Sequence, residues 1–356
     1  MRQVKIGNKV IGDGQPAFVI AEMAWSHDGS LAKAKKIVKG TADAGADAIS
    51  IHITRIKDYM VKAYGSAAGQ AVSAGKETEI IYDYLNRVNL KDSDWKELFV
   101  YAKGMGVAVC AMPNDMQSLK LCENLEPDAY VIAAACFVEE NMVTEVGKQK
   151  KPVILRIGGA TLGEIEATAN RIREQGNEDI ILLHGFQSYP TKIENTRLRL
   201  IPSFKTLFGL PVGLADHIDA ESHLALEVPL VAMGLGANII EKHVTHDRSL
   251  KGEDFESALN PSELKKLVSD IREIEKALGP TAFGPLSAEE MRYRRVSRKR
   301  TVANRLIKKG TKLTEKDIVF KRADDGIYPD ESKFIIGRTA SENIKGDAAL
   351  TWDKLL

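Results

Sequence analysis

Eight apolar runs of strand length recur along most of this chain and alternate with amphipathic stretches of helix length. The runs cover residues 17–21, 48–53, 106–111, 129–133, 152–155, 180–183, 211–214 and 237–240. Helical patterns begin near Leu31, Ser93, Gln117, Glu139, Leu162, Ile193, Ala220 and Pro261. Eight successive β/α units predict a closed (β/α)8 TIM barrel over residues 1–280, with a doubly wound sheet as the alternative. A long loop with a short helix is expected at 59–89.

The last of these helices has the best-defined ends. Asn260 is a capping residue type, Pro261 suits the first helical position, and Glu263 lies where a capping box needs it. Apolar residues then recur at helical spacing until Gly279. The pattern predicts a helix that begins at Pro261 and ends just before Gly279.

The character of the chain changes after Gly279. Residues 281–297 read as a linker, and residues 298–356 form a small second unit with short β-type segments at 300–304, 318–322 and 348–351. Six of the nine residues from 292 to 300 are Arg or Lys. An exposed helix end or an interface with an acidic partner explains this run better than an RNA-binding patch.

Charge and composition exclude several kinds of protein. A formal net charge of +1 gives no support for nucleic acid or an anionic membrane as a general partner. Three cysteines without CxxC spacing suggest neither a disulfide framework nor a zinc cage. The N-terminus lacks the apolar core of a signal peptide, and the longest apolar stretch, 224–240, is interrupted by Glu227 and Pro229. We therefore expect a reduced, cytoplasmic protein.

Two histidines follow predicted strands that are consecutive along the chain. His217 closes the segment Gly-Leu-Ala-Asp-His, and His243 lies in Glu-Lys-His-Val-Thr. Because the carboxyl ends of parallel strands gather on one face of a barrel, these imidazoles are placed to share a metal ion. The alternative is two unrelated polar loop residues. An acid-rich stretch at 247–254 follows and favours the metal site.

Five segments, in their order along the chain, resemble the motifs of one family. They are Val-Ile-Ala-Glu-Met-Ala-Trp-Ser-His-Asp-Gly at 19–29, Ala-Gly-Ala-Asp-Ala at 44–48, Leu-Leu-His-Gly-Phe-Gln-Ser-Tyr-Pro-Thr at 182–191, and the two histidine segments. The chain resembles the sialic acid synthases, a family that includes legionaminic and pseudaminic acid synthases. Its tail, with Ile-Lys-Lys-Gly at 307–310 and Lys-Arg at 321–322, is similar to the family's antifreeze-like (β-clip type) domain.

The resemblance implies a metal-dependent, aldol-type transferase. Phosphoenolpyruvate, or another three-carbon acid donor, would condense with the aldehyde of an amino sugar to give a nonulosonic acid. His217 and His243 correspond to the metal ligands, and imidazole suits Mn²⁺ better than Mg²⁺. The resemblance also implies a domain-swapped homodimer, in which Arg322 of one subunit reaches the sugar bound by its neighbour. The catalytic positions it implies are Glu22, Tyr189, Glu241 and Asp254.

The chain departs from the family where the family grips phosphoenolpyruvate. Those positions hold Ser50, Val131, Ala134, Cys136 and Arg156, and Gln187 replaces an asparagine. Charge-assisted hydrogen bonds contribute about 1.5–3 kcal/mol each, so the loss of several predicts poor phosphoenolpyruvate binding. Arg156, His52 and Gln187 are the candidate substrate-binding residues that remain.

Three hypotheses about function stay open. The first is a true synthase in which Arg156 and a rebuilt loop hold phosphoenolpyruvate. The second is a diverged paralogue that retains the metal and sugar sites but uses another donor in an aldolase- or lyase-type reaction. Cys136 is a conceivable nucleophile there, although a small packing residue is the favoured interpretation. The third is a non-catalytic sugar-binding relative. The residues do not specify the sugar or the pathway.

Overall fold

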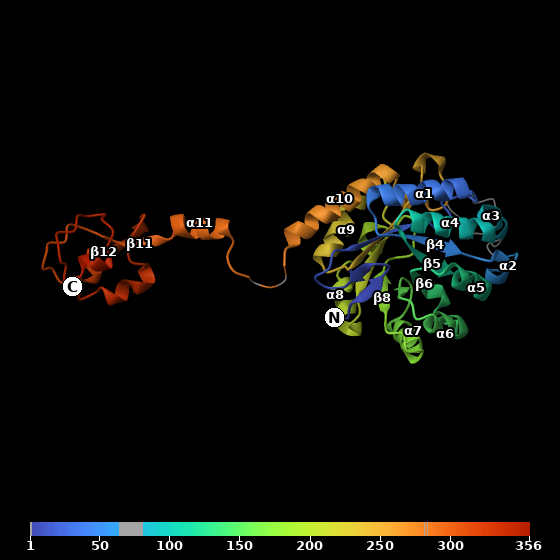
Figure 1. Cartoon of the computed structure of the whole chain (residues 1–356), viewed down its shortest axis with the longest axis horizontal. Helices are drawn as coiled ribbons and strands as arrows, with labels where there is room; N and C mark the ends of the chain where they lie inside the picture. The colour runs from blue at the N-terminus through green and yellow to red at the C-terminus, as the bar shows by residue number, and fades with distance from the viewer. Residues whose placement is uncertain (1, 64–80, 281, 283) are drawn as a thin grey trace. The chain divides into compact units, whose positions relative to one another are not determined.

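The first of the chain's two units is a closed barrel of eight parallel strands, as the alternating pattern predicted. A computed structural model describes residues 2–63, 81–280, 282 and 284–356, in two compact units, Met1–Pro280 and Thr281–Leu356. The strands close in the order β10-β3-β4-β5-β6-β7-β8-β9. Figure 1 labels β4, β5, β6 and β8 of this barrel. They are β3 (Phe18–Glu22), β4 (Ala48–Ile53), β5 (Ala108–Pro113), β6 (Ala129–Ala133), β7 (Val153–Arg156), β8 (Ile180–His184), β9 (Val212–Asp216) and β10 (Ile239–His243).

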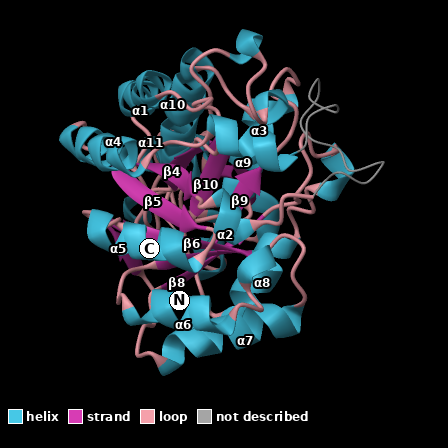
Figure 2. Cartoon of the chain, turned by 90° about the vertical axis from the view of Figure 1, so that its right-hand side faces the viewer, coloured by secondary structure: helices cyan, strands magenta, loops and turns pink. Residues whose placement is uncertain are grey.

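Helices surround the barrel on its outside (Figure 2). The principal ones are α1 (Leu31–Ala44), α4 (Asp92–Gly104), α5 (Met116–Leu125), α6 (Glu140–Lys148), α7 (Leu162–Glu174), α8 (Leu200–Phe208), α9 (Leu224–Gly234) and α10 (Pro261–Leu278). Each buries an apolar face; in α1 this face includes Ile37 and Val38. None of the helices that the structure describes combines the length and apolar character that a membrane crossing requires.

Most predicted helix starts are confirmed, and two are wrong. The helix α10 has the predicted bounds, and Glu263 accepts a hydrogen bond from the backbone N–H of Asn260 at 2.7 Å. The segment at Ile193 is a single 3-10 turn, Ile193–Asn195, and α8 begins only at Leu200. The helix α9 begins at Leu224, four residues later than expected. Of the predicted 59–89 loop, residues 64–80 lie outside the described residues, and two short helices, α2 (Ile56–Tyr59) and α3 (Ile81–Val88), flank them.

An N-terminal hairpin that the sequence analysis missed covers one end of the barrel. Strands β1 (Val4–Ile6) and β2 (Lys9–Ile11) are antiparallel. Their buried side chains Val4, Ile6 and Ile11 belong to the same apolar cluster as Phe18 and Ile20 of the barrel interior. This cluster fills the barrel interior from its amino-terminal end, and the buried charged side chains of the interior, such as Glu22 and Glu241, lie toward the opposite end.

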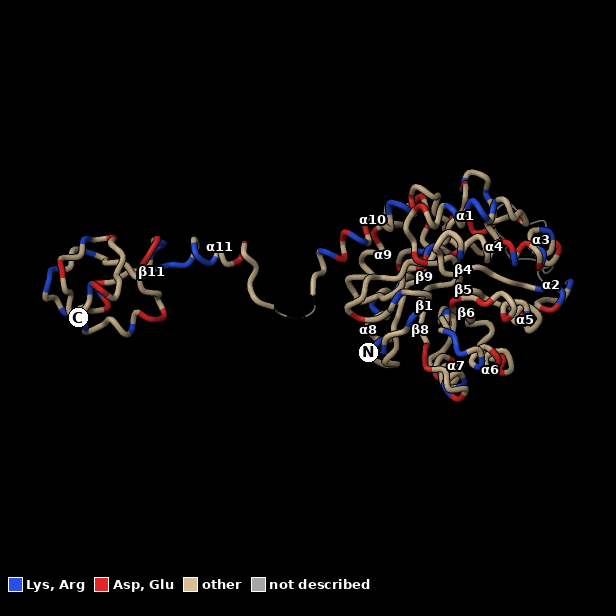
Figure 3. The backbone as a smooth tube through the Cα atoms, viewed as in Figure 1, with Lys and Arg blue, Asp and Glu red and all other residues tan. Residues whose placement is uncertain are grey.

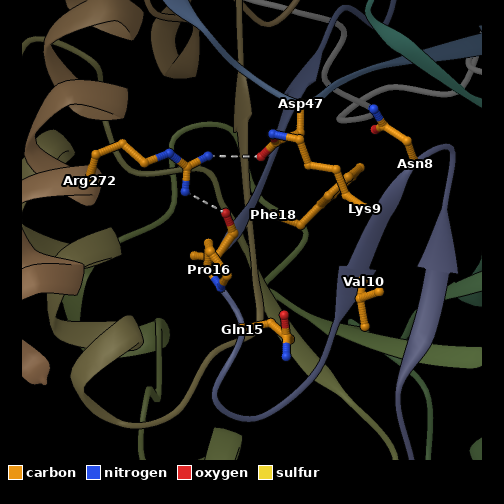
Figure 4. A pocket seen from close by; sticks show the side chains of 9 residues that line it. Asn8, Lys9, Val10, Gln15, Pro16, Phe18, Asp47 and Arg272 are labelled. Atoms are coloured by element: carbon orange, nitrogen blue, oxygen red, sulfur yellow. Dashed lines mark hydrogen bonds and ion pairs between the residues drawn. The ribbon is translucent and has the colours of Figure 1, made fainter. Parts of the chain in front are cut away.

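A cavity of about 340 Å³ lies beside this hairpin, at the amino-terminal ends of β3 and β4 (Figure 4). Its charged side chains are already paired. The buried carboxylate of Asp47 contacts Lys9, and Arg272 lies 3.0 Å from it. A further hydrogen bond of 2.9 Å joins Arg272 to the carbonyl of Ala17. We therefore assign Asp47, Lys9 and Arg272 a structural role, in which they connect the hairpin and α10 to the barrel.

The second unit has its own small core. Strands β11 (Lys299–Ala303) and β12 (Ile318–Arg322) are antiparallel. The predicted strand at 348–351 is present only as an isolated bridge between Val302 and Ala349. Helix α11 (Ala288–Ser297) occupies much of the segment expected to be a linker, and no residue in it is buried. Figure 3 shows Lys and Arg along α11 and into β11, which agrees with an exposed, basic helix end.

Candidate active site

The carboxyl-terminal end of the barrel holds a cluster of buried charged side chains. Glu22 ends β3, Arg156 ends β7, and Glu241 lies in the middle of β10. Each is at most 3% exposed. Because successive side chains of a strand point to opposite faces, these three share the interior with the apolar residues two positions earlier, such as Ile20 and Ile239.

Arg156 connects opposite walls of the barrel. In the closed order of strands, β7 lies opposite β3. The Arg156 guanidinium nevertheless contacts the Glu22 carboxylate, and its Nη2 lies 2.9 Å from Oε2 of Glu241. The other oxygen of Glu22 lies 3.2 Å from Nε2 of His52 and accepts a hydrogen bond from the Ala24 backbone N–H at 2.8 Å. The arginine therefore lies across the interior of the barrel mouth, with its charge shared between two carboxylates.

The two histidines expected to bind metal are brought side by side. His243 is the register partner of Glu22, and its ring centroid lies 5.1 Å from that of His217. Nδ1 of His217 lies 2.8 Å from the carbonyl oxygen of Phe186, to which it donates as the neutral imidazole. Nε2 of both rings is buried without a hydrogen-bond partner among the residues that the structure describes. The prediction that these rings lie close together is confirmed; that they bind an ion stays a prediction.

Three other expected site residues surround the histidines. The Tyr189 ring lies 4.6 Å from the His217 ring and 5.3 Å from the His243 ring, centroid to centroid. The Tyr189 hydroxyl donates to Oε1 of Gln187 at 2.9 Å. Oδ2 of Asp254 lies 3.8 Å from Nδ1 of His243. Tyr189 is 37% exposed, so this side of the cluster opens to solvent.

Burial and neighbouring charges give Glu22 and Glu241 different pKa values. Burial alone would raise the pKa of Glu22, but Arg156 and His52 hold it well below its usual value. Burial raises the pKa of Glu241 to about 7; Arg156 opposes this rise and the negative charge of Glu22 adds to it. Glu22 is thus ionised at neutral pH, while Glu241 can hold or release a proton there.

The same burial keeps the histidines neutral. It lowers the pKa of His217 to about 4 and that of His243 well below its usual value. Neutral imidazole is the form that binds metal ions. Among the described residues, no group of three or more His, Cys, Asp or Glu side chains is arranged to hold an ion. The two histidines therefore fit as a partial ligand set that substrate or water would complete.

Apart from Arg156, the positions that depart from the family motif hold uncharged side chains. Ser50, Val131 and Ala134 contribute no charge, and Ala134–Cys136 forms a 3-10 turn after β6. Cys136 is buried, and burial raises the pKa of its thiol to about 12, with Glu139 adding to the rise. A thiol that stays protonated is a poor nucleophile, which favours the packing interpretation of Cys136.

Arg322 is the one expected site residue that belongs to the second unit. It is exposed at the end of β12, opposite Lys299 in the ladder. Its role stays a prediction.

Sequence reasoning missed two features of the site. The Trp25 ring packs edge-on against His52, with centroids 5.0 Å apart. A buried ion pair joins Asp216 and Lys242, which immediately precede the two histidines. Trp25, Asp216 and Lys242 lie within the motif segments, so their positions in those segments were the available signal, whereas His52 lies outside them.

Comparisons with known proteins show which family the chain resembles over its whole length. The NeuB family model matches residues 37–282, and the SAF domain model matches residues 301–356. An uncharacterised protein of Methanocaldococcus jannaschii is 33% identical, over 100% of this chain and 99% of its own length. The N,N'-diacetyllegionaminic acid synthase of Campylobacter jejuni is 32% identical, over 93% of this chain and 97% of its own. The solved structure of the N-acetylneuraminic acid synthetase of Leptospira borgpetersenii is 28% identical, covers 82% of this chain and 96% of its own, and has a TM-score of 0.71.

Proposed function

Because the chain belongs to the NeuB family of sialic acid synthases, we propose that it joins a three-carbon acid donor to the aldehyde of an amino sugar, forming a nonulosonic acid. The observation that supports this most directly is the cluster at the barrel mouth. Two neutral histidines, a tyrosine and two carboxylates of different proton affinity lie together there. In TIM-barrel enzymes the active site lies at this end of the strands.

We assign the candidate metal site to His217 and His243. The ion, Mn²⁺ in preference to Mg²⁺, would polarise the aldehyde oxygen of the sugar. The fit rests on two buried, unpartnered Nε2 atoms and on the hydrogen bond that directs the His217 ring. A His217→Ala, His243→Ala double variant should lose the Mn²⁺ that the wild-type protein retains after dialysis, measured by elemental analysis. Equal metal content in the two proteins would disprove the assignment.

The other roles follow from position and charge. Glu241 would hold or release a proton during bond formation, while Glu22 stays ionised beside Arg156 and His52. Tyr189, Gln187 and Asp254 would contact the sugar. Arg322 would reach the same sugar from a neighbouring subunit of a domain-swapped homodimer.

Product formation with a panel of N-acyl amino sugars tests the proposed reaction. The Mn²⁺-loaded protein is mixed with each sugar and either phosphoenolpyruvate or pyruvate. Mass spectrometry then detects the nonulosonic acid, and a phosphate assay detects cleavage of phosphoenolpyruvate. We expect product with at least one sugar. No product from any sugar with either donor would refute the proposal.

A second candidate differs in the donor. The cation expected to hold phosphoenolpyruvate, Arg156, is already engaged by Glu22 and Glu241. A phosphate dianion at that arginine would face two carboxylates, a repulsion that the neutral Ser50 and Ala134 do not offset. This favours a donor without phosphate, such as a 2-oxo acid. In that reaction C3 of the donor loses a proton and bonds to the aldehyde carbon, and the new alkoxide gains a proton. Nonulosonic acid formed from pyruvate, without phosphate release from phosphoenolpyruvate, would show that the donor is a 2-oxo acid.

A further inference from the structure

A buried ion pair lies directly beside the two candidate metal-binding histidines. Asp216 precedes His217, and Lys242 precedes His243. Their Cα atoms are register partners in the parallel pairing of β9 and β10. Nζ of Lys242 lies 2.7 Å from Oδ2 of Asp216, and the side chains are 0% and 1% exposed.

The register of this pair determines where the imidazoles lie. Since side chains alternate along a strand, Asp216 and Lys242 point to the face opposite the histidines. A shift of one residue between β9 and β10 would separate the rings. The second oxygen of Asp216 accepts a hydrogen bond from the Ile218 backbone N–H at 3.0 Å. One carboxylate therefore fixes the partner strand and also the backbone on both sides of His217.

Stability alone does not explain an ion pair in this place. Desolvation of two charges offsets most of their attraction, and a well-packed apolar pair of similar volume is often equally stable. A hydrogen-bonded ion pair differs from an apolar contact because it requires one distance and one direction. Asp216 and Lys242 each directly precede one of the two histidines, so the geometry of the ion pair constrains the backbone next to each imidazole.

We propose that Asp216 and Lys242 are positioning residues that hold β9 and β10 at the spacing at which His217 and His243 share one divalent ion. The inference rests on the proposed metal site. It extends that site to a second layer of residues, on the opposite face of the strands, that do not touch the ion.

The main test replaces the pair by apolar residues of similar shape. In the Asp216→Leu, Lys242→Met double variant, the dissociation constant for Mn²⁺, measured by equilibrium dialysis, should rise about 10- to 100-fold. The urea midpoint should stay close to that of the wild type, because no unpaired charge is left buried. The single variant Lys242→Met should lose both metal affinity and stability.

Arg272→Met provides a matched control. It removes a cation from Asp47, a carboxylate that is also 1% exposed but lies at the other end of the barrel. This variant should lose stability and keep the wild-type dissociation constant for Mn²⁺. If the double variant binds Mn²⁺ as the wild type does, the positioning role is wrong and the metal site stands. If affinity falls only in proportion to stability across all the variants, Arg272→Met included, the pair is merely structural. If the wild type binds no Mn²⁺, the metal site and this inference fail together.

Discussion

Arg156 illustrates how one side chain can determine the charge of a whole barrel mouth. Its guanidinium is buried with two carboxylates, so each of the three charges depends on the others. Such a group is insensitive to solvent salt but intolerant of losing one member. The same arrangement limits how much positive charge Arg156 can offer to an incoming anion.

Replacing Arg156 should therefore destabilise the protein, because Glu22 and Glu241 would remain buried without the cation between them. We expect Arg156→Met to lower the free energy of unfolding by about 3–5 kcal/mol, measured by urea denaturation at pH 8 without metal. Adding Glu22→Gln and Glu241→Gln to this variant should recover most of the loss, because no buried charge then remains. A stable Arg156→Met protein would show that the carboxylates find compensation elsewhere.

The raised pKa of Glu241 predicts a pH-dependent stability with a definite sign. Its pKa rises from 4.5 to about 7 on folding, so the folded state holds the proton more tightly. Its contribution is fully present below pH 4.5 and is lost as the pH rises through 7. The slope reaches roughly 1.4 kcal/mol per pH unit. Glu241→Gln should thus gain stability relative to the metal-free wild type between pH 4.5 and 7, by on the order of 3 kcal/mol.

Chemical denaturation of both proteins across this pH range is the measurement. Glu166→Gln, on the exposed face of α7, is the control and should track the wild type. If the free energy of unfolding of Glu241→Gln changed with pH in parallel with that of the wild type, the pKa of Glu241 would not be raised by folding.

The strands of the barrel show why apolar patterns locate elements better than they locate sites. The runs at 48–53 and 129–133 match β4 and β6. Other strands continue past the predicted end to include a buried polar residue, such as Glu22, Arg156 or His243. An apolar run stops at the first charge, whereas a barrel strand continues into the polar mouth. The residues that the predicted strand ends leave out are therefore candidate site residues.

Some other features of the fold and the site could not be predicted from the local sequence. The antiparallel hairpin β1–β2 is stabilised by the barrel interior, through contacts with residues such as Phe18 that its own short sequence does not encode. The histidine pair was predictable, because strand order brings its two segments together. The contact of Arg156 with Glu22 was not, since it depends on a side chain that crosses between opposite strands. Tertiary packing decided both of these outcomes.

The loop after β8 depends on a glycine for its approach to β9. A Cβ at Gly185 would lie 2.4 Å from the carbonyl oxygen of Ala215, a contact that neither backbone can relieve without moving. The next residue, Phe186, supplies the carbonyl that directs the His217 ring. Close packing of these two segments is thus part of the geometry of the candidate metal site.

Gly185→Ala should accordingly disturb both packing and metal binding. We expect a loss of about 1–3 kcal/mol in the free energy of unfolding. We also expect weaker Mn²⁺ binding by equilibrium dialysis, because the hydrogen bond to His217 would lengthen. Gly163→Ala in α7, where a Cβ meets nothing within 4 Å, is the matched control and should be neutral or slightly stabilising. If Gly185→Ala bound Mn²⁺ with wild-type affinity, the packing of this loop would not be part of the metal site.

The chain as a whole consists of two units that each bury an apolar core of their own. Among the residues that the structure describes, the apolar core of the second unit includes Ala303, Ile307, Leu313 and Ile335. A unit with its own core can act on the barrel of a neighbouring subunit as readily as on its own. This independence is the physical condition that a domain-swapped homodimer requires.

Mixing two variants that are each expected to be inactive would test the proposed exchange of the second unit. Arg322→Ala removes the side chain expected to act in the neighbour, and His217→Ala, His243→Ala removes the metal ligands of the barrel. In a mixed dimer, the barrel with intact histidines would receive Arg322 from its partner, so one of its two sites would be complete. Co-refolding equal amounts should restore about a quarter of the wild-type turnover, because half of the dimers are mixed. If Arg322 instead served the barrel of its own chain, every site would lack one group and mixing would restore nothing.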